Sequence, residues 1–254
     1  MQAPPTPLKP LDDALQELLA HAQPLAGAES VDTFEADGRV LLQAAVSPLQ
    51  VPPQDNSAMD GYAVRAEECA SGGAELPVSQ RIPAGVAPDA LVAGSVARIF
   101  TGAPVPAGAD AIVMQEDCEV LEDGRVRIKT QPKAGQWIRR SGEDIRQGAT
   151  VIEAGVRLTP AHLGLAASMG FASLPVARKP RVAMFSTGDE LVMPGTVAPQ
   201  DMKPGSIYNS NRFFLRALLL RMGCEVTDLG IVPDDREATV AALAKAAVDH
   251  DVIV

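Results

Sequence analysis

The sequence has 254 residues, 46% of them hydrophobic, which is enough chain for one large core or two modest ones. Its 32 acidic and 22 basic residues give a net charge of −10 with no basic stripe, which argues against a nucleic-acid-binding surface. No apolar stretch reaches the roughly 18 residues of a transmembrane helix, no signal peptide is visible, and the cysteine spacing suggests no disulfide framework, so we expect a cytoplasmic protein that binds no membrane.

Helical periodicity marks the first forty residues. After a proline-rich start, leucine and alanine recur at helical spacing and predict a helix from Leu11 to Ala22. A second periodic stretch, 33–42, also predicts a helix. Gly38 costs about 1 kcal/mol relative to alanine inside a helix, and its presence suggests close packing at that point.

From residue 47 to residue 145, short β-prone runs alternate with clusters of proline and glycine. Runs such as Ala111–Met114 and 126–128 predict strands. The Asp123-Gly124 pair lies between two apolar runs and predicts a tight hairpin, because these residues readily supply the positive φ angles that such a turn needs. This part of the chain is therefore expected to be a β-rich module.

The last third of the chain has a different pattern, which follows a short predicted helix at 161–169 and a proline-bounded junction at 175–180. Strand-like and helix-like segments alternate as β-α-β-α-β, which predicts parallel strands joined by right-handed crossovers and covered on both faces. The expected strands are 181–185, 226–229 and 251–254; one expected helix follows a cap at Asn209 or Ser210, and the other spans 236–248.

These patterns together predict a multidomain α+β fold, with a β-rich module inserted in a helical stem and a partial α/β domain after it. The expected parts are an N-terminal helix (1–26), the helical stem (27–46 and 146–180), the inserted module (47–145) and the incomplete α/β domain (181–254).

Two loops at the carboxyl ends of the first two α/β strands combine small residues with carboxylates. Hydroxyl and amide donors of Ser186, Thr187 and Gly188 suit a phosphate, whereas Glu190 and Asp234 offer the hard oxygen ligands that Mg²⁺ prefers. On either loop alone, capping of a turn or helix would explain the carboxylates. Because both loops are expected at one sheet edge, we favour a phosphate and magnesium site.

Three other polar segments leave their role open. The segment 51–65 is as consistent with an Asx-turn loop as with a site. The segment 98–106 is a strand ending in a hydroxyl and a glycine, and it is equally undecided. In 139–144 two arginines alternate with two carboxylates, which could clamp an oxyanion, although a surface ion-pair network is the better interpretation.

The order and length of four motifs resemble one known family. The motifs are DNSAMDGYAVR at 55–65, RIFTGAPVPAGADAIVMQED at 98–117, RRSGEDI at 139–145 and FSTGDEL at 185–191. The chain after residue 10 is similar throughout to the molybdopterin molybdotransferases of the MoeA family, which also occur as the E-type domain of gephyrin. The α/β domain would then be the family's molybdopterin-binding domain.

The resemblance implies an elongated homodimer that inserts molybdate into adenylylated molybdopterin in a Mg²⁺-dependent step and releases AMP. It implies catalytic roles for Asp60, Thr101, Glu190 and Asp234, of which the last two would hold Mg²⁺ and Asp60 would reach its site across the dimer cleft. The residues expected to bind substrate are Asn56, Ser57, Met59, Arg139, Asp144, Ser186, Thr187, Gly188 and Asp189. The molybdopterin adenylyltransferase would be a further partner.

The family pattern continues past the third α/β strand with a Ser-Gly-Gly-Val-Ser loop and a C-terminal β domain that this sequence lacks. We therefore expect a C-terminally truncated enzyme that is inactive alone. Two other functions stay open: a gephyrin-type scaffold, against which the missing second catalytic domain argues, and the adenylyltransferase itself, which the segment 55–65 and the β-rich module oppose.

Overall fold

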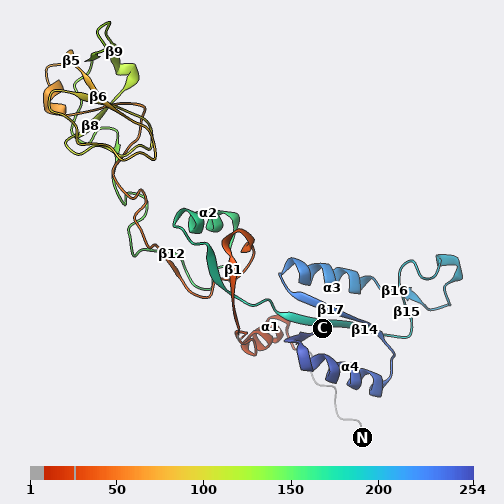
Figure 1. Ribbon diagram of the computed structural model, residues 1–254. Helices are drawn as coiled ribbons and strands as arrows, with labels where there is room; N and C mark the ends of the chain where they lie inside the picture. The colour runs from red at the N-terminus through yellow and green to blue at the C-terminus, as the bar shows by residue number, and fades with distance from the viewer. Residues whose placement is uncertain (1–8, 26) are drawn as a thin grey trace. The chain divides into compact units, whose positions relative to one another are not determined.

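The computed structural model describes residues 9–25 and 27–254, so the proline-rich start lies outside the described residues. The chain divides into two compact units (Figure 1). Unit 1 comprises 1–43, 154–164 and 171–254, and unit 2 comprises 44–153 and 165–170. The fold is mixed α/β, with several small β-sheets and a parallel sheet near the C-terminus. None of the described helices is long and apolar enough to cross a membrane.

The core of unit 2 is a four-stranded sheet of order β6-β7-β4-β8. Its strands are β6 (Val78–Ile82), β7 (Val96–Ile99), β4 (Gly61–Val64) and β8 (Ala111–Met114). Strand β6 runs parallel to β7, and the other pairs are antiparallel. Alternate residues of these strands face two separate apolar clusters, one around Tyr62 and Val113 and one around Ile99 and Ile112, so both faces of the sheet are buried.

A second sheet of unit 2, of order β5-β10-β9, covers the Tyr62 cluster with Val126 and Ile128. The hairpin predicted at Asp123-Gly124 joins β9 (Cys118–Val120) to β10 (Val126–Ile128) and is confirmed, with Gly124 at φ +84°. The remaining elements of this unit are β2 (Ala45–Val46), β3 (Asn56–Ser57), η2 (Ala66–Cys69), β5 (Ala74–Leu76), η3 (Gln115–Asp117), β11 (Ile138–Arg139) and β12 (Thr150–Ile152).

The stem segments contain more strand than predicted, so the expectation of a helical stem is wrong. Strand β1 (Ala28–Asp32) pairs antiparallel with β13 (Ser173–Ala177), which occupies part of the segment taken as a junction. Of the stretch 33–42 only Thr33–Glu35 (η1) is helical, because Gly38 adopts φ +72° and Leu41 pairs its backbone with neighbouring strands. The short helix α2 (Pro160–Ser168) is confirmed.

The α/β part of unit 1 has the predicted β-α-β-α-β order. Its sheet, β17-β14-β18, is parallel throughout, and helices α3 and α4 lie on opposite faces of it (Figure 1). The elements are β14 (Arg181–Thr187), α3 (Ser210–Arg221), β17 (Glu225–Val232), α4 (Arg236–Asp249) and β18 (Val252–Ile253). Between β14 and α3 lie η4 (Pro199–Asp201) and a small parallel pair of strands, β15 (Leu191–Val192) and β16 (Ile207–Tyr208). Strand β17 continues to Val232, three residues beyond the prediction, through a register shift against β14.

Helix α1 (Leu11–Ala20) confirms the first predicted helix, but it buries none of its side chains. Its leucines at 11, 15, 18 and 19 are all at least half exposed. An isolated helix of this length is marginal in water.

Candidate functional site

The two candidate loops of the α/β part lie at the same sheet edge. In the parallel pairing of β14 with β17, Ser186 is the partner of Ile231 and Thr187 the partner of Val232, so both strands end together. The backbone N–H of Asp234 donates to Oδ1 of Asp189 at 3.3 Å and links the two loops directly. Sequence reasoning anticipated this convergence from the parallel strand order.

A pocket of about 370 Å³ opens at this edge. Its walls come from the end of β14 and from the start of α3, and they include Ser186, Thr187, Glu190, Asn209 and Ser210. The Nδ2 group of Asn209, a buried side chain, donates to Oγ of Ser186 at 3.0 Å, while its Oδ1 caps α3 by accepting from the N–H of Arg212. Because the first turn of a helix presents unpaired N–H groups, this pocket suits an anion.

Gly188 determines the shape of the loop that carries Glu190. It is buried and has φ +135°, a conformation that side-chain-bearing residues rarely adopt. A Cβ atom at this position would lie 2.5 Å from Oε2 of Glu190. The positive φ favours glycine here, and the Glu190 carboxylate lies folded back into space that a Cβ would take. The carbonyl of Glu190 accepts from the N–H of Ile207 at 2.9 Å.

The carboxylates near this pocket come from three residues, Asp189, Glu190 and Asp234. Glu190 lines the pocket, Asp234 is exposed beyond it, and Asp189 is engaged with the Asp234 amide. In the part of the chain that the structure describes, no three histidine, cysteine or carboxylate groups gather closely enough to hold a metal ion by themselves. Mg²⁺ is, however, usually held by one or two carboxylates plus substrate phosphates and water, so this donor set fits a cation that arrives with a nucleotide.

Sequence reasoning missed the second wall of the pocket, Tyr208–Asn211. Asn209 was interpreted only as a helix cap, and its bond to Ser186 connects segments 23 residues apart. The sequence nevertheless held a signal for this second wall. Strand β14 and the capped start of α3 belong to one β-α unit, and ligands of open α/β sheets bind at the carboxyl ends of the strands.

On unit 2, Asp60 directly precedes β4 and Thr101 follows the end of the antiparallel strand β7, and the two residues form a close pair. Oδ1 of Asp60 accepts from both the backbone N–H of Thr101, at 2.8 Å, and its Oγ1 hydroxyl, at 2.7 Å. The Thr101 hydroxyl bond is the largest cause of a lowered pKa for Asp60, with the Thr101 amide next. Asp60 is thus an ionised carboxylate held in one direction, with no hydrogen bond to Oδ2 among the described residues.

The loop before Asp60 is held both by a turn within it and by backbone bonds to neighbouring segments. The Ser57 hydroxyl is buried and donates to the carbonyl of Met59 at 2.5 Å, and the Ser57 backbone pairs with Gly102 and Ala103. Oδ1 of Asn56 is buried without a hydrogen-bond partner among the described residues. These contacts place Asn56, Ser57 and Met59 beside the Asp60–Thr101 pair. The Ser57 hydroxyl hydrogen already donates within the turn, to the carbonyl of Met59.

The segment 139–144 forms an ion-pair network. Arg139 pairs with Asp144 at 2.5 Å, which raises the pKa of the Arg139 guanidinium, and Arg140 pairs with Asp55 at 2.6 Å. The backbone N–H of Ser141 donates to Asp55 and, as the largest cause, lowers the pKa of that carboxyl. Exposed pairs of this kind contribute about 0–1 kcal/mol, and Arg139 and Asp144 contact each other in this structure.

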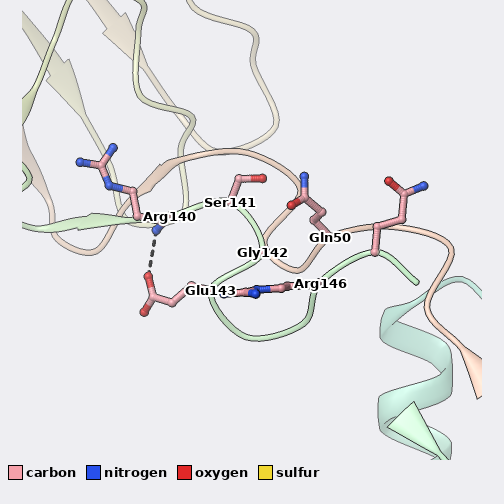
Figure 2. A pocket seen from close by; sticks show the side chains of 7 residues that line it. Gln50, Arg140, Ser141, Gly142, Glu143 and Arg146 are labelled. Carbon is pink, nitrogen blue, oxygen red and sulfur yellow. Dashed lines mark hydrogen bonds between the residues drawn. The ribbon is translucent and has the colours of Figure 1, made fainter. Parts of the chain in front are cut away.

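A second pocket, of about 490 Å³, lies beside this network (Figure 2). It is lined by Gln50, Ser141, Gly142 and Arg146 together with neighbours in 140–147. Figure 2 shows the Arg140 backbone N–H bonded to Glu143 and the Arg140 guanidinium directed away from the other lining residues. The pocket therefore has one guanidinium, that of Arg146, available to it.

Two family models match successive parts of the chain. Residues 9–170 match the "MoeA N-terminal region (domain I and II)", and residues 183–254 match the "Probable molybdopterin binding domain". The first match alone covers more than half of the chain.

The chain is also similar to curated relatives and solved structures. It is 37% identical over 244 residues to a molybdopterin molybdenumtransferase of Haemophilus influenzae and 46% identical over 231 residues to molybdopterin molybdenumtransferase 2 of Mycobacterium tuberculosis. These alignments cover 96% and 89% of this chain but 59% and 56% of the relatives. A crystal structure of a MoeA protein from Pyrococcus horikoshii OT3 matches with a TM-score of 0.89 and 32% identity, over 97% of this chain and 66% of that one.

Proposed function

Because this chain belongs to the MoeA family of molybdopterin molybdenumtransferases, we propose that the protein carrying it transfers molybdenum from molybdate to adenylylated molybdopterin and releases AMP. The observation that supports this most directly is the pocket at the α/β sheet edge, where hydroxyl and amide donors meet the Glu190 carboxylate. The chain spans 56–59% of the length of the curated relatives described above.

Within this pocket, the chain's own groups would bind and orient the adenylate phosphate. The hydroxyls of Ser186 and Thr187 and the first N–H groups of α3 are the available donors, and Asn209 fixes the Ser186 hydroxyl. Fixed donors of this kind stabilise charge that develops on phosphoryl oxygens without having to reorganise during the reaction.

Glu190 and Asp234 are the residues that would hold Mg²⁺. When bound, the ion would neutralise phosphate charge and polarise the phosphorus for attack. The loops support this assignment, because the Asp189–Asp234 bond keeps the second loop beside the first and Gly188 keeps the Glu190 carboxylate against the pocket wall.

We assign Asp60 and Thr101 to the same reaction as an ionised carboxylate and its orienting hydroxyl. They lie in unit 2, whereas the phosphate pocket lies in unit 1. The proposal follows the family's homodimer, in which the β-rich module of one chain would serve the pocket of its partner. A cytoplasmic location and an association with the molybdopterin adenylyltransferase remain predictions from the sequence.

The test is AMP release by the protein that carries this chain, supplied with adenylylated molybdopterin, molybdate and Mg²⁺. Glu190→Gln and Asp234→Asn should each lower the rate by roughly a hundredfold, which is within the range of electrostatic contributions to catalysis. Asp249→Asn is the matched control, since Asp249 is exposed at the far end of α4. Unchanged AMP release in both pocket variants would contradict the assignment.

Product analysis separates this function from that of the adenylyltransferase. A molybdenumtransferase consumes adenylylated molybdopterin, whereas the adenylyltransferase accumulates it. The match of residues 9–170 to the MoeA N-terminal region favours consumption.

A further inference from the structure

Arg98 of β7 lies three residues before Thr101 and is the register partner of Tyr62, two residues after Asp60. Its Nη1 group donates to the carbonyl of Gly61, the residue after Asp60, at 2.8 Å. Its Nη2 group donates to Oε1 of Gln115 at 2.6 Å, and the Gln115 backbone N–H in turn donates to the carbonyl of Asp60 at 3.1 Å. The two peptide groups that follow Asp60 are therefore held by one guanidinium, the 61–62 group directly and the 60–61 group through Gln115.

The same guanidinium also holds the Thr101 side of the pair. It lies over the ring of Phe100, the residue before Thr101, at 4.6 Å from the centroid, and over the ring of Tyr62 at 5.2 Å. Arg98 and Tyr62 are register partners on β7 and β4, and Tyr62 is buried in the core of unit 2. The planar guanidinium is thus anchored to the rigid part of the sheet while its donors reach the site.

From these contacts we infer that Arg98 is a positioning residue for the Asp60–Thr101 pair. It acts through the backbone of Asp60 and the ring before Thr101, and it fixes the direction in which Oδ2 of Asp60 points. The inference rests on the proposed function, since that is where Asp60 receives its role. Small displacements of a positioned group can lower a rate by as much as a hundredfold.

Arg81 provides a matched control on the neighbouring strand. It is the register partner of Arg98 in the parallel β6–β7 pair, and its guanidinium lies over the same Phe100 ring at 4.5 Å. Unlike that of Arg98, the Arg81 guanidinium makes no hydrogen bond among the described residues. A general effect of positive charge or of stacking on Phe100 would involve both arginines, whereas positioning of Asp60 involves Arg98 alone.

The charged groups around Asp60 come from three elements. They are Arg98 of β7, Arg81 of β6 and Glu116 of η3, which accepts a hydrogen bond from the Gln115 side chain. After the two Thr101 bonds, attraction to Arg98 is a further cause of the lowered pKa of Asp60. Removal of Arg98 should therefore raise this pKa, and replacement by lysine should largely preserve it while losing the hydrogen-bond geometry.

The first test is kinetic and uses the protein that carries this chain. Arg98→Lys and Arg98→Ala should lower kcat for AMP release by roughly tenfold to a hundredfold, with KM changed by less than about twofold. Arg81→Ala should stay within about twofold of the unaltered protein in both parameters. Equal losses in the Arg81 and Arg98 variants, or full activity in Arg98→Lys, would overturn the inference.

The second test needs no activity and therefore separates this inference from the proposed function. In the 254-residue chain, hydrogen exchange of the Thr101 and Gln115 amides should speed up in Arg98→Lys and not in Arg81→Lys. The Asp60 carboxyl resonance should titrate at higher pH in Arg98→Ala. If Arg98→Ala fails to fold, the two lysine variants decide the matter by exchange alone. Unaltered exchange in Arg98→Lys would refute the positioning role even if AMP release depends on Asp60.

Discussion

At the scale of single residues, the Asp60–Thr101 pair shows how a surface carboxylate can be kept ionised without burial of charge. Two donors from one threonine converge on a single oxygen of Asp60. A group whose folded pKa is depressed contributes stability above its unfolded pKa, and this contribution is lost as the pH falls through the folded value. The Asp60 contribution is therefore fully present at neutral pH and disappears only in acid.

Thr101→Val should raise the pKa of Asp60 toward its ordinary value, because valine keeps the shape of threonine and removes the hydroxyl, which is the largest cause of the shift. The remaining Thr101 amide bond should keep the pKa somewhat lowered. A carboxyl NMR titration measures this shift, and Thr101→Ser, which retains a hydroxyl, is the control. An Asp60 pKa that is the same in the valine and serine variants would show that the hydroxyl has no such role.

Gly188→Ala should distort the Glu190 loop, because the added Cβ would lie 2.5 Å from the Glu190 carboxylate. Gly195→Ala is the control: its φ is also positive, at +85°, but its Cβ would meet open space. The backbone cost is about 1–2 kcal/mol for Gly195, which is near the left-handed helical region. Gly188, at φ +135°, should lose at least as much thermal stability. Only Gly188→Ala should weaken Mg²⁺-dependent nucleotide binding, by about tenfold in calorimetry. Equal binding by the two variants would remove the role assigned to Gly188.

At the scale of elements, a helix or strand could be predicted from its apolar spacing when that spacing is set by local structure, and not when it is set by contacts distant in the sequence. The strands and helices from Arg181 onward were predicted because short apolar runs alternate with capped helical segments, the local pattern of a β-α-β unit with parallel strands. The stretch 33–42 was not, since Leu41 is buried by pairing with residues more than a hundred positions away and its spacing only mimics a helix. The pocket shows the same limit: Ser186 and Glu190 were found from their loop, whereas Asn209 joined them only through tertiary contact.

Asp251, just before β18, links the start of β18 to the start of β14 through hydrogen bonds to Arg178 and Arg181. Its two carboxylate oxygens accept from the Nη1 and Nη2 groups of Arg178 at 2.6 Å, and Oδ2 also accepts from the backbone N–H of Arg181. The Arg178 side-chain bond is the largest cause of a strongly lowered pKa for Asp251. The stability that this carboxylate supplies is therefore present at neutral pH and lost as the pH falls below the ordinary value of about 4 for Asp.

Asp251→Asn should lower the midpoint of thermal unfolding at pH 7 and reduce its dependence on pH between about 5 and 2. Circular dichroism melts across this range measure both effects. Asp249→Asn, two residues earlier and exposed, is the control and should leave the pH dependence unchanged. A variant at Asp251 that melts like the unaltered chain at every pH would show that the ion pair does not fasten the sheet.

At the scale of the whole molecule, the two halves of the proposed site lie in different compact units, so the oligomeric state bears directly on catalysis. If Asp60 of one chain serves the pocket of its partner, inactive variants should complement each other. An equimolar, reassembled mixture of Asp60→Asn and Glu190→Gln should recover about a quarter of full AMP release, because half of the dimers would contain one intact site of two. A single chain with both changes, mixed with itself, should stay inactive. No recovery in the mixture, with mixed dimers shown by native mass spectrometry, would place the site within one chain.

The two segments that connect the β-rich module to its flanks run side by side. Val51 and Ile145 exchange both backbone hydrogen bonds, at 2.8 and 3.0 Å, and β2 pairs with β12 a few residues further out. The first and last residues of the module thus lie next to each other, paired through the backbones of Val51 and Ile145. In evolutionary terms, a single recombination at that point could add or delete some ninety residues without parting the flanking strands, and a simple hairpin turn would be enough to close the gap.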